Sequence, residues 1–383
     1  MKHLFSKGIM ILCMGLFLAA CGNDEPPVQT DDLDATKTAI LTQYVNGVVV
    51  PTYKSLADEA ILLQNVCAQL RLTPSQALVN EACDKWIAAR KYWEQSEAFL
   101  YGAAADYFID PHIDSWPLKK DQLDNVLKNS ELMEELDQDG AAADGFATLG
   151  YGLLGFHAVE YVIFRDGAPR NISDISEGEL IYVLAVAQDL ATQTARLEAA
   201  WAGLDKVSNE KKAMLEEFEL EPSLNYGEMM INAGMKGNTS YKTQMDALIQ
   251  ILQGASDISD EVGNTKITDP CTSGNVLDVE SWYSWNSIAD FADNIRSVRN
   301  AYYGSTDGTV NTNSLAAYVK KNYSTFDTDL RAKIDNAILK IEDPTVGMPA
   351  PFRNHLTFAE NQGAIDACNE LMEAIDDVIA ILQ

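Results

Sequence analysis

The segment GFATLGYGLLGFHAVEYVIF, residues Gly145 to Phe164, contains one charged pair, His157 and Glu160, in otherwise uncharged surroundings. On an α-helix, residues three positions apart project from the same face about one turn apart. Burying a carboxylate costs about several kcal/mol of lost hydration, unless the group is paired or bound to a cation. We therefore predict that Glu160 has a partner, and His157 is the nearest candidate.

The rest of the chain has helical periodicity with almost no strand-like alternation. The sequence predicts an all-α protein made of two up-and-down helical bundles packed side by side, because long helices with short polar links favour such bundles. The expected domains are 34–210, which holds the His157 segment, and 211–383. The expected helices are 34–70 (with Pro51 as a kink or break), 74–101, 141–164, 176–202, 223–263, 281–303, 314–322, 325–342 and 356–382.

The N-terminus has the pattern of a lipoprotein leader. Lys2 and Lys7 precede an apolar core, and residues 18–21 (LAAC) match a bacterial lipobox, in which Cys21 is lipidated after cleavage. We therefore expect a signal peptide at 1–20 and a flexible polar tether at 21–33. The predicted location is the outer membrane, on its periplasmic or cell-surface face, with the lipid anchor as the only membrane contact.

The charge balance limits the partners. The chain has 57 acidic and 28 basic residues, a net charge of −29. Such a surface repels nucleic acid and anionic membranes and suits cationic partners or simple solubility.

Four cysteines remain after the leader and Cys21: Cys67, Cys83, Cys271 and Cys368. Their spacing does not suggest a zinc site. Two structural disulfides, Cys67 with Cys83 and Cys271 with Cys368, are the favoured interpretation, and reduced buried thiols are the alternative.

Two further segments hold candidate site residues. Trp86, Arg90, Trp93 and Glu97 share one helical face, where Arg90 and Glu97 either belong to a site or form a structural ion pair. A loop contains Asp106, Asp110, His112 and Asp114, which suits a metal but is more often a solvated acidic loop. His355 has no neighbours that suggest more than a capping or surface role.

Imidazole and carboxylate groups are good ligands for iron or zinc. His157 and Glu160 are thus either metal ligands or a satisfied structural pair. The glycines of this segment disfavour a regular helix and indicate close packing or a local distortion. The sequence lacks HExxH, GxSxG, a P-loop and a GxGxxG after a strand.

Residues 155–160 (GFHAVE) resemble the GxHxxE signature of the imelysin-like family, which is also named for insulin-cleaving membrane peptidases. The segments around Arg90, Trp116, Gly263 and Asp290, and the run 302–304 (YYG), are similar to that family as well. The resemblance implies two helical bundles with a site where they meet, and an association with iron uptake in bacteria. It also implies that Asp290 and Asn294 belong to the site, although their spacing alone would assign them to a solvent face.

Three functions follow as hypotheses. The favoured one is a lipid-anchored envelope protein that binds iron, zinc or an iron-containing ligand with His157 and Glu160, assisted by Arg90, Glu97, Asp290 and Asn294, and that works with an iron-transport membrane partner. The second is a metallopeptidase, although one His–Glu pair supplies fewer ligands than a hydrolytic zinc normally takes. The third is a non-enzymatic surface module for a protein, peptide or glycan.

Overall fold

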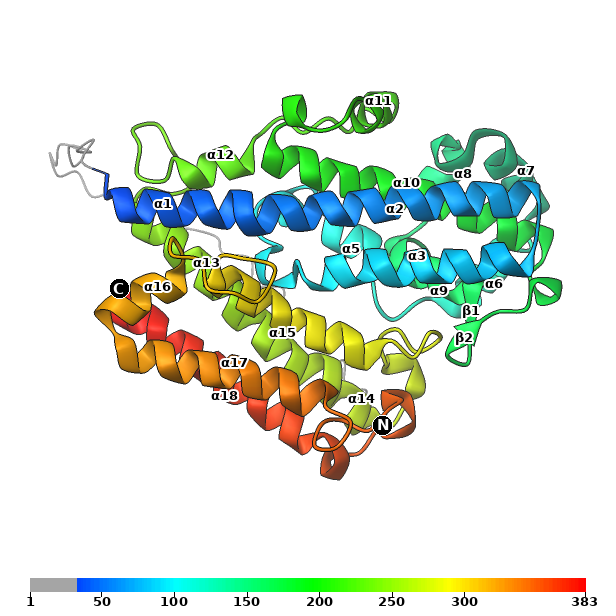
Figure 1. Ribbon diagram of the computed structural model, residues 1–383. Coiled ribbons are helices and arrows are strands. Elements are labelled where there is room, and N and C mark those ends of the chain that lie inside the picture. Colours follow the sequence, from blue (N-terminus) through cyan, green and yellow to red (C-terminus); the bar gives the residue numbers. More distant parts are fainter. Residues whose placement is uncertain (1–32) are drawn as a thin grey trace, which may run out of the picture.

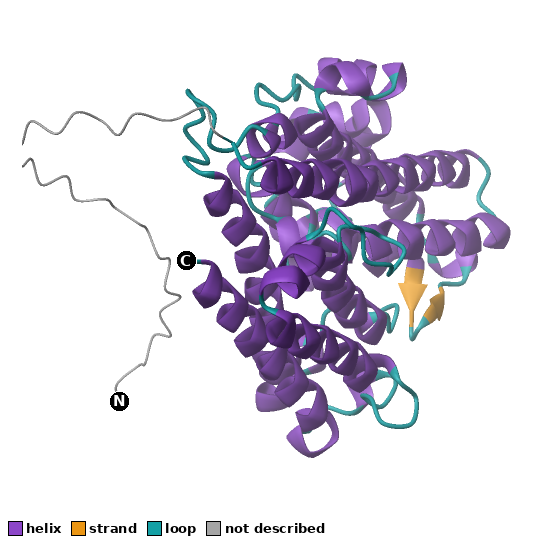
Figure 2. Cartoon of the chain, turned by 60° about the vertical axis from the view of Figure 1, so that its left-hand side comes forward, coloured by secondary structure: helices purple, strands orange, loops and turns teal. Residues whose placement is uncertain are grey.

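The computed structural model describes residues 33–383. The predicted signal peptide, the lipidated Cys21 and nearly all of the predicted tether lie outside the described residues. Within residues 33–383, the chain is helical apart from its loops and one two-stranded hairpin, as Figure 2 shows. The prediction of an all-α fold is therefore confirmed.

The first group of helices is built on one long rod. Helix α1 (Ala35–Tyr44), the π-helix η1 (Val45–Val49) and α2 (Val50–Leu72) run on without a loop, and Pro51 occupies the first turn of α2. Helices α3 (Gln76–Glu94) and α10 (Glu177–Ala202) pack along α2 (Figure 1). Helix α10 begins with a capping box, in which Ser176 and Glu179 satisfy each other's backbone N–H groups.

Short elements connect α3 to α10. They include η2 (Glu97–Phe99), α4 (Ala103–Asp106), α5 (Ile109–Ile113) and α9 (Gly155–Ile163), of which η2, α5 and α9 carry or adjoin site residues. The others are α6 (Lys120–Val126), α7 (Ser130–Asp139), η3 (Gly140–Ala142), α8 (Asp144–Ala147), η4 (Tyr151–Leu153), the hairpin β1 (Phe164–Arg165) and β2 (Ala168–Pro169), and η5 (Ile172–Asp174).

The second group contains the C-terminal helices. Helices α13 (Gln244–Glu261), α15 (Ser287–Tyr303), α17 (Ser324–Glu342) and α18 (Phe358–Leu382) pack against one another. The π-helix η7 (Val262–Ile267) continues α13 directly. The smaller elements are η6 (Leu204–Lys206), α11 (Asn209–Glu217) and α12 (Tyr226–Ile231), which precede α13, and then α14 (Thr268–Ser273), η8 (Val276–Asp278), α16 (Leu315–Asn322) and η9 (Phe352–Asn354).

The two groups meet along α3 and the turn that follows it. Helix α15 packs on α3, and α13 packs on η2. Apolar side chains from both groups form one continuous core. The site described below lies at this junction, so its residues come from both ends of the chain. The predicted division of the chain after residue 210 stays a proposal. In residues 33–383 we find no helix with the length and apolar character needed to cross a membrane.

Three sequence expectations need correction. The helix expected over 141–164 is broken into α8, η4 and α9, because Gly150 is extended and Gly155 has a positive φ. The helix expected over 223–263 is split into α12 and α13 by a loop. The expected disulfides, Cys67 with Cys83 and Cys271 with Cys368, are absent from the structure, where all four are free thiols. Cys83 Sγ instead donates to the Ile163 carbonyl, and Cys271 Sγ accepts from Asn361.

Candidate functional site

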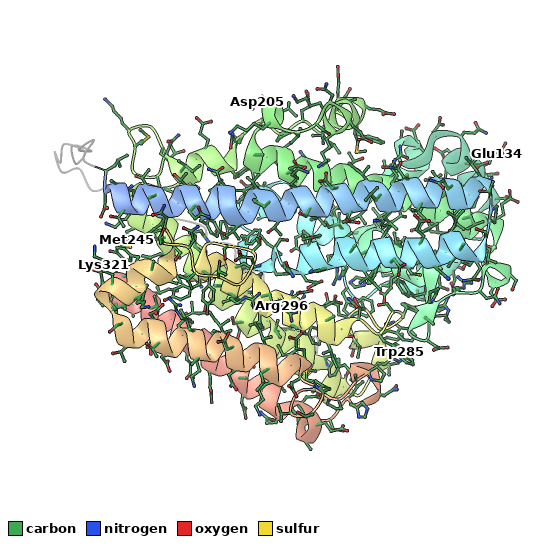
Figure 3. The ribbon with its side chains drawn as sticks, viewed as in Figure 1. Glu134, Asp205, Met245, Trp285, Arg296 and Lys321 are labelled. Atoms are coloured by element: carbon green, nitrogen blue, oxygen red, sulfur yellow. The ribbon has the colours of Figure 1, made fainter. Side chains whose placement is uncertain are left out.

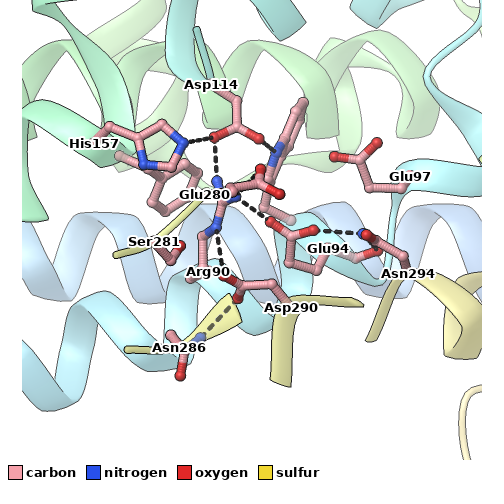
Figure 4. Close-up of polar contacts among 12 residues, drawn as sticks. Arg90, Glu94, Glu97, Asp114, His157, Glu280, Ser281, Asn286, Asp290 and Asn294 are labelled. Atoms are coloured by element: carbon pink, nitrogen blue, oxygen red, sulfur yellow. Dashed lines mark hydrogen bonds and ion pairs between the residues drawn. The ribbon is translucent and has the colours of Figure 1, made fainter. Parts of the chain in front are cut away.

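Arg90 lies at the centre of a buried cluster of carboxylates (Figure 4). Its Nη1 donates to Asp114 Oδ1, and its Nη2 lies 2.7 Å from Glu280 Oε1 and close to Glu94 Oε1. Asp290 Oδ2 lies 3.8 Å from Arg90 Nε. A planar guanidinium with five donors can contact several carboxylates at once, which a lysine cannot do in the same way. Arg90 therefore contacts four acidic side chains: one from its own helix, one from the chain after α5, and two from the loop before α15 and from α15 itself.

Helix α3 carries three side chains that face the cluster. Arg90 and Glu94 are four residues apart and share a face, and the indole of Trp93 points to the same cluster. The helix ends at Glu94, and the turn η2 then places Glu97 beside the cluster. The predicted pairing of Arg90 with Glu97 is not formed: Glu97 faces Lys266, with 3.8 Å between Glu97 Oε1 and Lys266 Nζ.

Asp114 follows the short helix α5 and has a nearly buried side chain, 4% exposed. Its Oδ2 accepts a hydrogen bond from Trp93 Nε1 at 2.6 Å. Burial alone would raise the pKa of this carboxyl, but the Arg90 guanidinium and His157 outweigh burial and hold that pKa well below its ordinary value. Asp114 is thus an ionised group in the interior, and the favoured interpretation of its loop as a solvated acidic loop is wrong at this residue.

Helix α9 presents His157 and Glu160 from one face, as their spacing predicts, and both are fully buried. His157 Nδ1 lies 3.3 Å from Glu160 Oε2, and Nε2 lies 3.1 Å from Asp114 Oδ1. Burial alone would lower the pKa of His157, but the contacts with Asp114 and Glu160 raise it to about 9. The ring is therefore held as an imidazolium between two carboxylates when no other cation is bound.

Glu160 is also bonded from the second group of helices. The backbone N–H and the hydroxyl of Ser284 both donate to its Oε1, at 2.8 and 2.7 Å. Ser284 belongs to the loop before α15, where Ser281 and Trp285 have positive φ angles of 53° and 63°. Backbone in that region is strained for non-glycine residues and is often found at functional sites.

Gly155 explains how α9 comes so close to α5. Its φ is +72°, and a Cβ atom on it would lie 1.9 Å from the Ile113 carbonyl oxygen. Only glycine combines this conformation with such an approach. The contact fixes the start of α9 beside the residue that precedes Asp114, which brings His157 within reach of that carboxylate.

A second cation, Lys266, enters the cluster from the π-helix η7. Its Nζ lies 3.2 Å from Glu280 Oε2 and 3.8 Å from both Glu94 Oε2 and Glu97 Oε1. The carboxylates around it keep the Lys266 pKa well above its ordinary value in spite of burial. π-Helices are rare and occur frequently at functional sites; here one places an ammonium group among three carboxylates.

Helix α15 contributes Asp290 and Asn294, both buried. Asn294 Nδ2 donates to Glu94 Oε2, and Asn286 Nδ2 donates to Asp290 Oδ1 at 2.7 Å. The face that spacing alone would assign to solvent therefore packs on α3. Asp290 Oδ2 lies 3.8 Å from Arg90 Nε, and Asn294 reaches the cluster through Glu94.

The cluster forms one wall of a cavity of about 670 Å³. Its lining includes Trp116, two prolines and one lysine, Lys266. Seven acidic residues also line it: Glu97, Asp110, Asp114, Glu261, Asp269, Asp278 and Glu280. The Trp116 ring lies over His157, with 4.5 Å between ring centroids. The lining includes Asp114 and Glu280 but not His157, which lies behind Asp114 and Trp116. An acidic cavity bounded by several buried carboxylates has the chemistry of a cation site.

The electrostatics of the cluster are unbalanced. Six buried carboxylates meet two permanent cations, Arg90 and Lys266, and one histidine; the carboxylates are Glu94, Glu97, Asp114, Glu160, Glu280 and Asp290. Burial raises the pKa of Glu94 and Glu97 well above the ordinary value and that of Asp290 to about 7. In the cavity wall, burial and nearby acids raise the pKa of Asp110 to about 7. The excess charge is thus relieved by bound protons or by a bound cation.

Several donor atoms are suitably placed for a metal. Two groups of three residues each place one ligand atom per residue within 4.8 Å of the others. The first group is Asp114, His157 and Glu280, and the second is Glu94, Glu97 and Asp114. Three of these buried atoms, His157 Nε2, Glu280 Oε2 and Glu94 Oε1, make no well-aligned hydrogen bond within residues 33–383. Each lies instead in an ion pair, with Asp114, Lys266 and Arg90 respectively. A cation fits this donor set, and it would compete with those charged groups for the same atoms.

The predicted site residues divide into two sets. The structure brings together His157, Glu160, Arg90, Glu97, Asp290 and Asn294, while their roles as ligands stay predictions. His112 lies apart, 2.9 Å from Asp189, and Asp106 accepts a hydrogen bond from Tyr226. His355 lies 2.8 Å from Glu360 on the surface. The three histidines therefore do not converge.

Three residues of the cluster were not named from the sequence: Glu94, Lys266 and Glu280. Asp114 was named as a possible metal ligand, but a solvated loop was the favoured interpretation. Glu94 had a detectable signal, since it lies four residues after Arg90 on the same helix. Asp114 directly precedes Ser115-Trp116-Pro117, one of the segments that resemble the family. Lys266 and Glu280 had no local signal, because a π-helix and an irregular loop bring them to the cluster.

Comparison with known proteins supports a family assignment. The imelysin model (peptidase family M75) matches residues 49–378. The chain is 24% identical over 369 residues to iron-regulated protein A of Synechococcus elongatus, covering 96% of this chain and 90% of that protein.

Two solved structures have a similar fold. A crystal structure described as an iron-regulated protein A precursor from Parabacteroides distasonis has a TM-score of 0.78 and 31% identity, with coverage of 96% of this chain and 98% of that one. An imelysin-like protein from Psychrobacter arcticum has a TM-score of 0.64 at 15% identity, covering 90% and 94%. With the family model spanning most of its length and a relative above 30% identity, the chain belongs to the imelysin family.

Proposed function

We propose that this protein binds an iron cation, alone or within a small ligand, in the acidic cavity at the junction of the two groups of helices, and acts as an accessory to iron uptake. The observation that carries the proposal is the excess of buried acidic side chains over buried cations. Six carboxylates face two permanent cations there, and the cluster opens onto a cavity of about 670 Å³.

The donor set favours iron among the common metals. Imidazole suits iron, zinc and copper, whereas carboxylates suit harder ions, so one histidine with several carboxylates matches iron best. Helical proteins hold iron with similar glutamate and histidine combinations in their cores. Asp114, His157 and Glu280 would be ligands. The name "iron-regulated protein", which two relatives carry, agrees with this choice.

Glu160 has a different role in this proposal. Metal-binding histidines usually give their other N–H to a carboxylate, which fixes the ring and its tautomer. His157 Nδ1 faces Glu160, and Glu160 is itself held by Ser284. Glu160 would thus orient the ring so that Nε2 faces the cavity side of the cluster. We propose it as a positioning residue.

The same contacts favour binding over peptide hydrolysis. A metallopeptidase needs a carboxylate that can take a proton from the attacking water. Glu160 is occupied by His157 and by two hydrogen bonds from Ser284. The lipid anchor at Cys21, the outer-membrane location and an iron-transport membrane partner remain part of the proposal.

The test is calorimetry of metal-free protein with Fe²⁺ under anaerobic conditions and with Zn²⁺, at pH 6 and pH 8. We expect saturable binding that is tighter at pH 8, because the metal must displace the proton of His157, whose pKa is raised to about 9. The protons of Asp110 and Asp290, whose pKa values are raised to about 7, add to this competition at pH 6. The double variant His157→Gln/Glu280→Gln should bind at least about tenfold more weakly.

The control is Glu210→Gln on the exposed surface of α11, which removes one charge far from the cavity. It should bind like the wild type. Thermal unfolding of each variant separates loss of binding from loss of folding. Absence of saturable binding in the wild type, or identical isotherms for the double variant and Glu210→Gln, would refute the proposal.

A further inference from the structure

We propose a second site, independent of the first: a basic pocket that binds a small oxyanion, a phosphate or a carboxylate group, through Lys91, Arg296 and Arg299. The pocket lies between α2, α3, α15 and the loop after α15, and has a volume of about 600 Å³. That volume lies within the range of about 300–1,000 Å³ usual for small-molecule sites.

Arg299 is the strongest indication. It is half-buried on α15, and within residues 33–383 it donates to no carboxylate. Its Nε is buried without a hydrogen-bond partner in the same residues. Most buried polar atoms have a partner. The chain has 57 acidic and 28 basic residues, yet this arginine lines the pocket without forming an ion pair with either of the pocket's two acids.

The other two cations face the same space. Lys91 lies on α3 and forms no ion pair in the described part of the chain; its ammonium lies 5.7 Å from the centre of the Tyr92 ring. Arg296, labelled in Figure 3, lies one helical turn before Arg299, where α15 packs on α3. The pocket therefore combines two cations that lack a carboxylate partner with one that is already paired.

The two acids of the pocket are engaged elsewhere. Asp293 accepts hydrogen bonds from Gln95 at 2.8 Å and from Arg296 at 3.0 Å. Asp307 caps its own loop, accepting from the Thr309 backbone N–H at 2.9 Å and from the Ser305 hydroxyl at 3.0 Å. Asp293 lies near enough to Lys91 to interact with its charge, but neither carboxylate forms an ion pair with Lys91 or Arg299 in residues 33–383. The lining thus holds three cations and two carboxylates.

The loop after α15 lies over the arginine. Gly308 has a φ of +79°, and a Cβ atom on it would lie 3.6 Å from Arg299 Cζ. Thr306 from this loop and Ser55 from α2 add hydroxyl groups to the lining. An oxyanion needs such an arrangement: a guanidinium fork that matches two oxygens, with hydroxyl donors for the others.

Helix α3 thus separates two sites of opposite charge. Arg90, Glu94 and the adjoining Glu97 face the acidic cluster, whereas Lys91, Tyr92 and Gln95 face the basic pocket. An anion and a cation can therefore be held on two sides of one helix without direct contact between the sites.

The experiment is calorimetry of metal-free protein at low ionic strength with two probes, inorganic phosphate and citrate. We expect saturable binding of at least one probe with a Kd below about 1 mM. Binding of phosphate alone or citrate alone identifies which oxyanion the pocket takes. The variants Arg299→Gln and Lys91→Gln should each weaken it at least about tenfold, or about 1.4 kcal/mol.

The matched control is Lys320→Gln, which removes an exposed lysine on α16 away from the pocket. It should bind both probes like the wild type. Arg299→Lys, which keeps the charge, should retain part of the affinity. If neither probe binds saturably, or if the Lys91 and Lys320 variants bind equally well, the pocket is not an oxyanion site. Lys91 is exposed, so its variant tests the proposal even if the Arg299 variant misfolds.

Discussion

His157 and Asp114 face each other across the junction of α9 and α5, with 3.1 Å between Nε2 and Oδ1. The other ring nitrogen of His157 faces Glu160 at 3.3 Å. A ring between two buried carboxylates is held in its charged form, so His157 serves as the resident cation of the metal-free site. A metal at the same place would have to replace its proton.

The first prediction concerns pH and stability in the presence of a chelator. The pKa of His157 is raised to about 9 in the folded protein, from about 6.5 in the unfolded chain. This group therefore contributes stability that is fully present below pH 6.5 and is lost as pH rises towards 9. The contribution is on the order of 3 kcal/mol. Urea unfolding at pH 6 and pH 9.5 should show this loss in the wild type.

His157→Gln provides the comparison, because it removes the titration while keeping a polar side chain of similar reach. Its unfolding free energy should change less between the two pH values than that of the wild type. Other acids with raised pKa values, such as Asp110 and Asp290, affect both proteins alike. Parallel profiles for the two proteins would contradict the assignment of the charge to His157.

The second prediction concerns Asp114. Asp114→Asn removes the carboxylate that contacts Arg90, Trp93 and His157. Removing one partner from a buried ion-pair network costs about 3–5 kcal/mol, and the pKa of His157 should fall because its strongest neighbour is neutral. Urea unfolding gives the first quantity and NMR titration of the imidazole gives the second. Asp278→Asn, in the wall of the same cavity, should change the unfolding free energy and the His157 pKa much less. Equal effects of the two variants would show that Asp114 is not the carboxylate that holds Arg90 and His157.

The third prediction concerns Lys266, whose ammonium occupies the space between Glu280, Glu94 and Glu97. Lys266→Met should lower the stability of the metal-free protein by about 3–5 kcal/mol, because it leaves buried carboxylates without their cation. Added metal should then restore stability through its binding free energy, and it should bind more tightly than to the wild type. Thermal unfolding with and without metal measures both effects, and Lys266→Arg is the charge-conserving control. If Lys266→Met is less stable than the wild type but added metal does not raise its unfolding temperature, the metal does not bind where the Lys266 ammonium lies.

Much of the fold was predictable because it rests on local signals. The long helices α10, α15, α17 and α18 follow from apolar periodicity. The predicted starts of α10, α17 and α18 lie within two residues of the observed ones, whereas α15 begins at Ser287, six residues after its predicted start. The π-helices η1 and η7 were not predictable. Each contains one glycine, Gly47 or Gly263, but a single glycine within a helical pattern does not distinguish a π-helix from an α-helix or a break.

The site was predictable only where its residues share a helix. His157 with Glu160, and Arg90 among its tryptophans, stand out because their spacing and apolar surroundings are visible locally. Asp114 and Glu280 reach the cluster through loops, and no periodic pattern shows whether a loop acid is buried. Asp290 shows the opposite failure: its face is polar, so the pattern favours solvent, yet α15 buries that face against α3.

The last prediction tests whether the approach of α9 to α5 builds the site. Gly155→Ala would place a Cβ 1.9 Å from the Ile113 carbonyl oxygen at a φ of +72°. Because backbone must move to relieve this clash, the variant should lose at least about 3 kcal/mol of stability, and the pKa of His157 should fall as Asp114 moves away. Gly150→Ala in the same segment is the matched control: its φ is −80°, and nothing lies within 4 Å of the new methyl group. If both variants unfold at the same urea concentration as the wild type, the close contact between α9 and α5 does not hold the histidine and the carboxylate together.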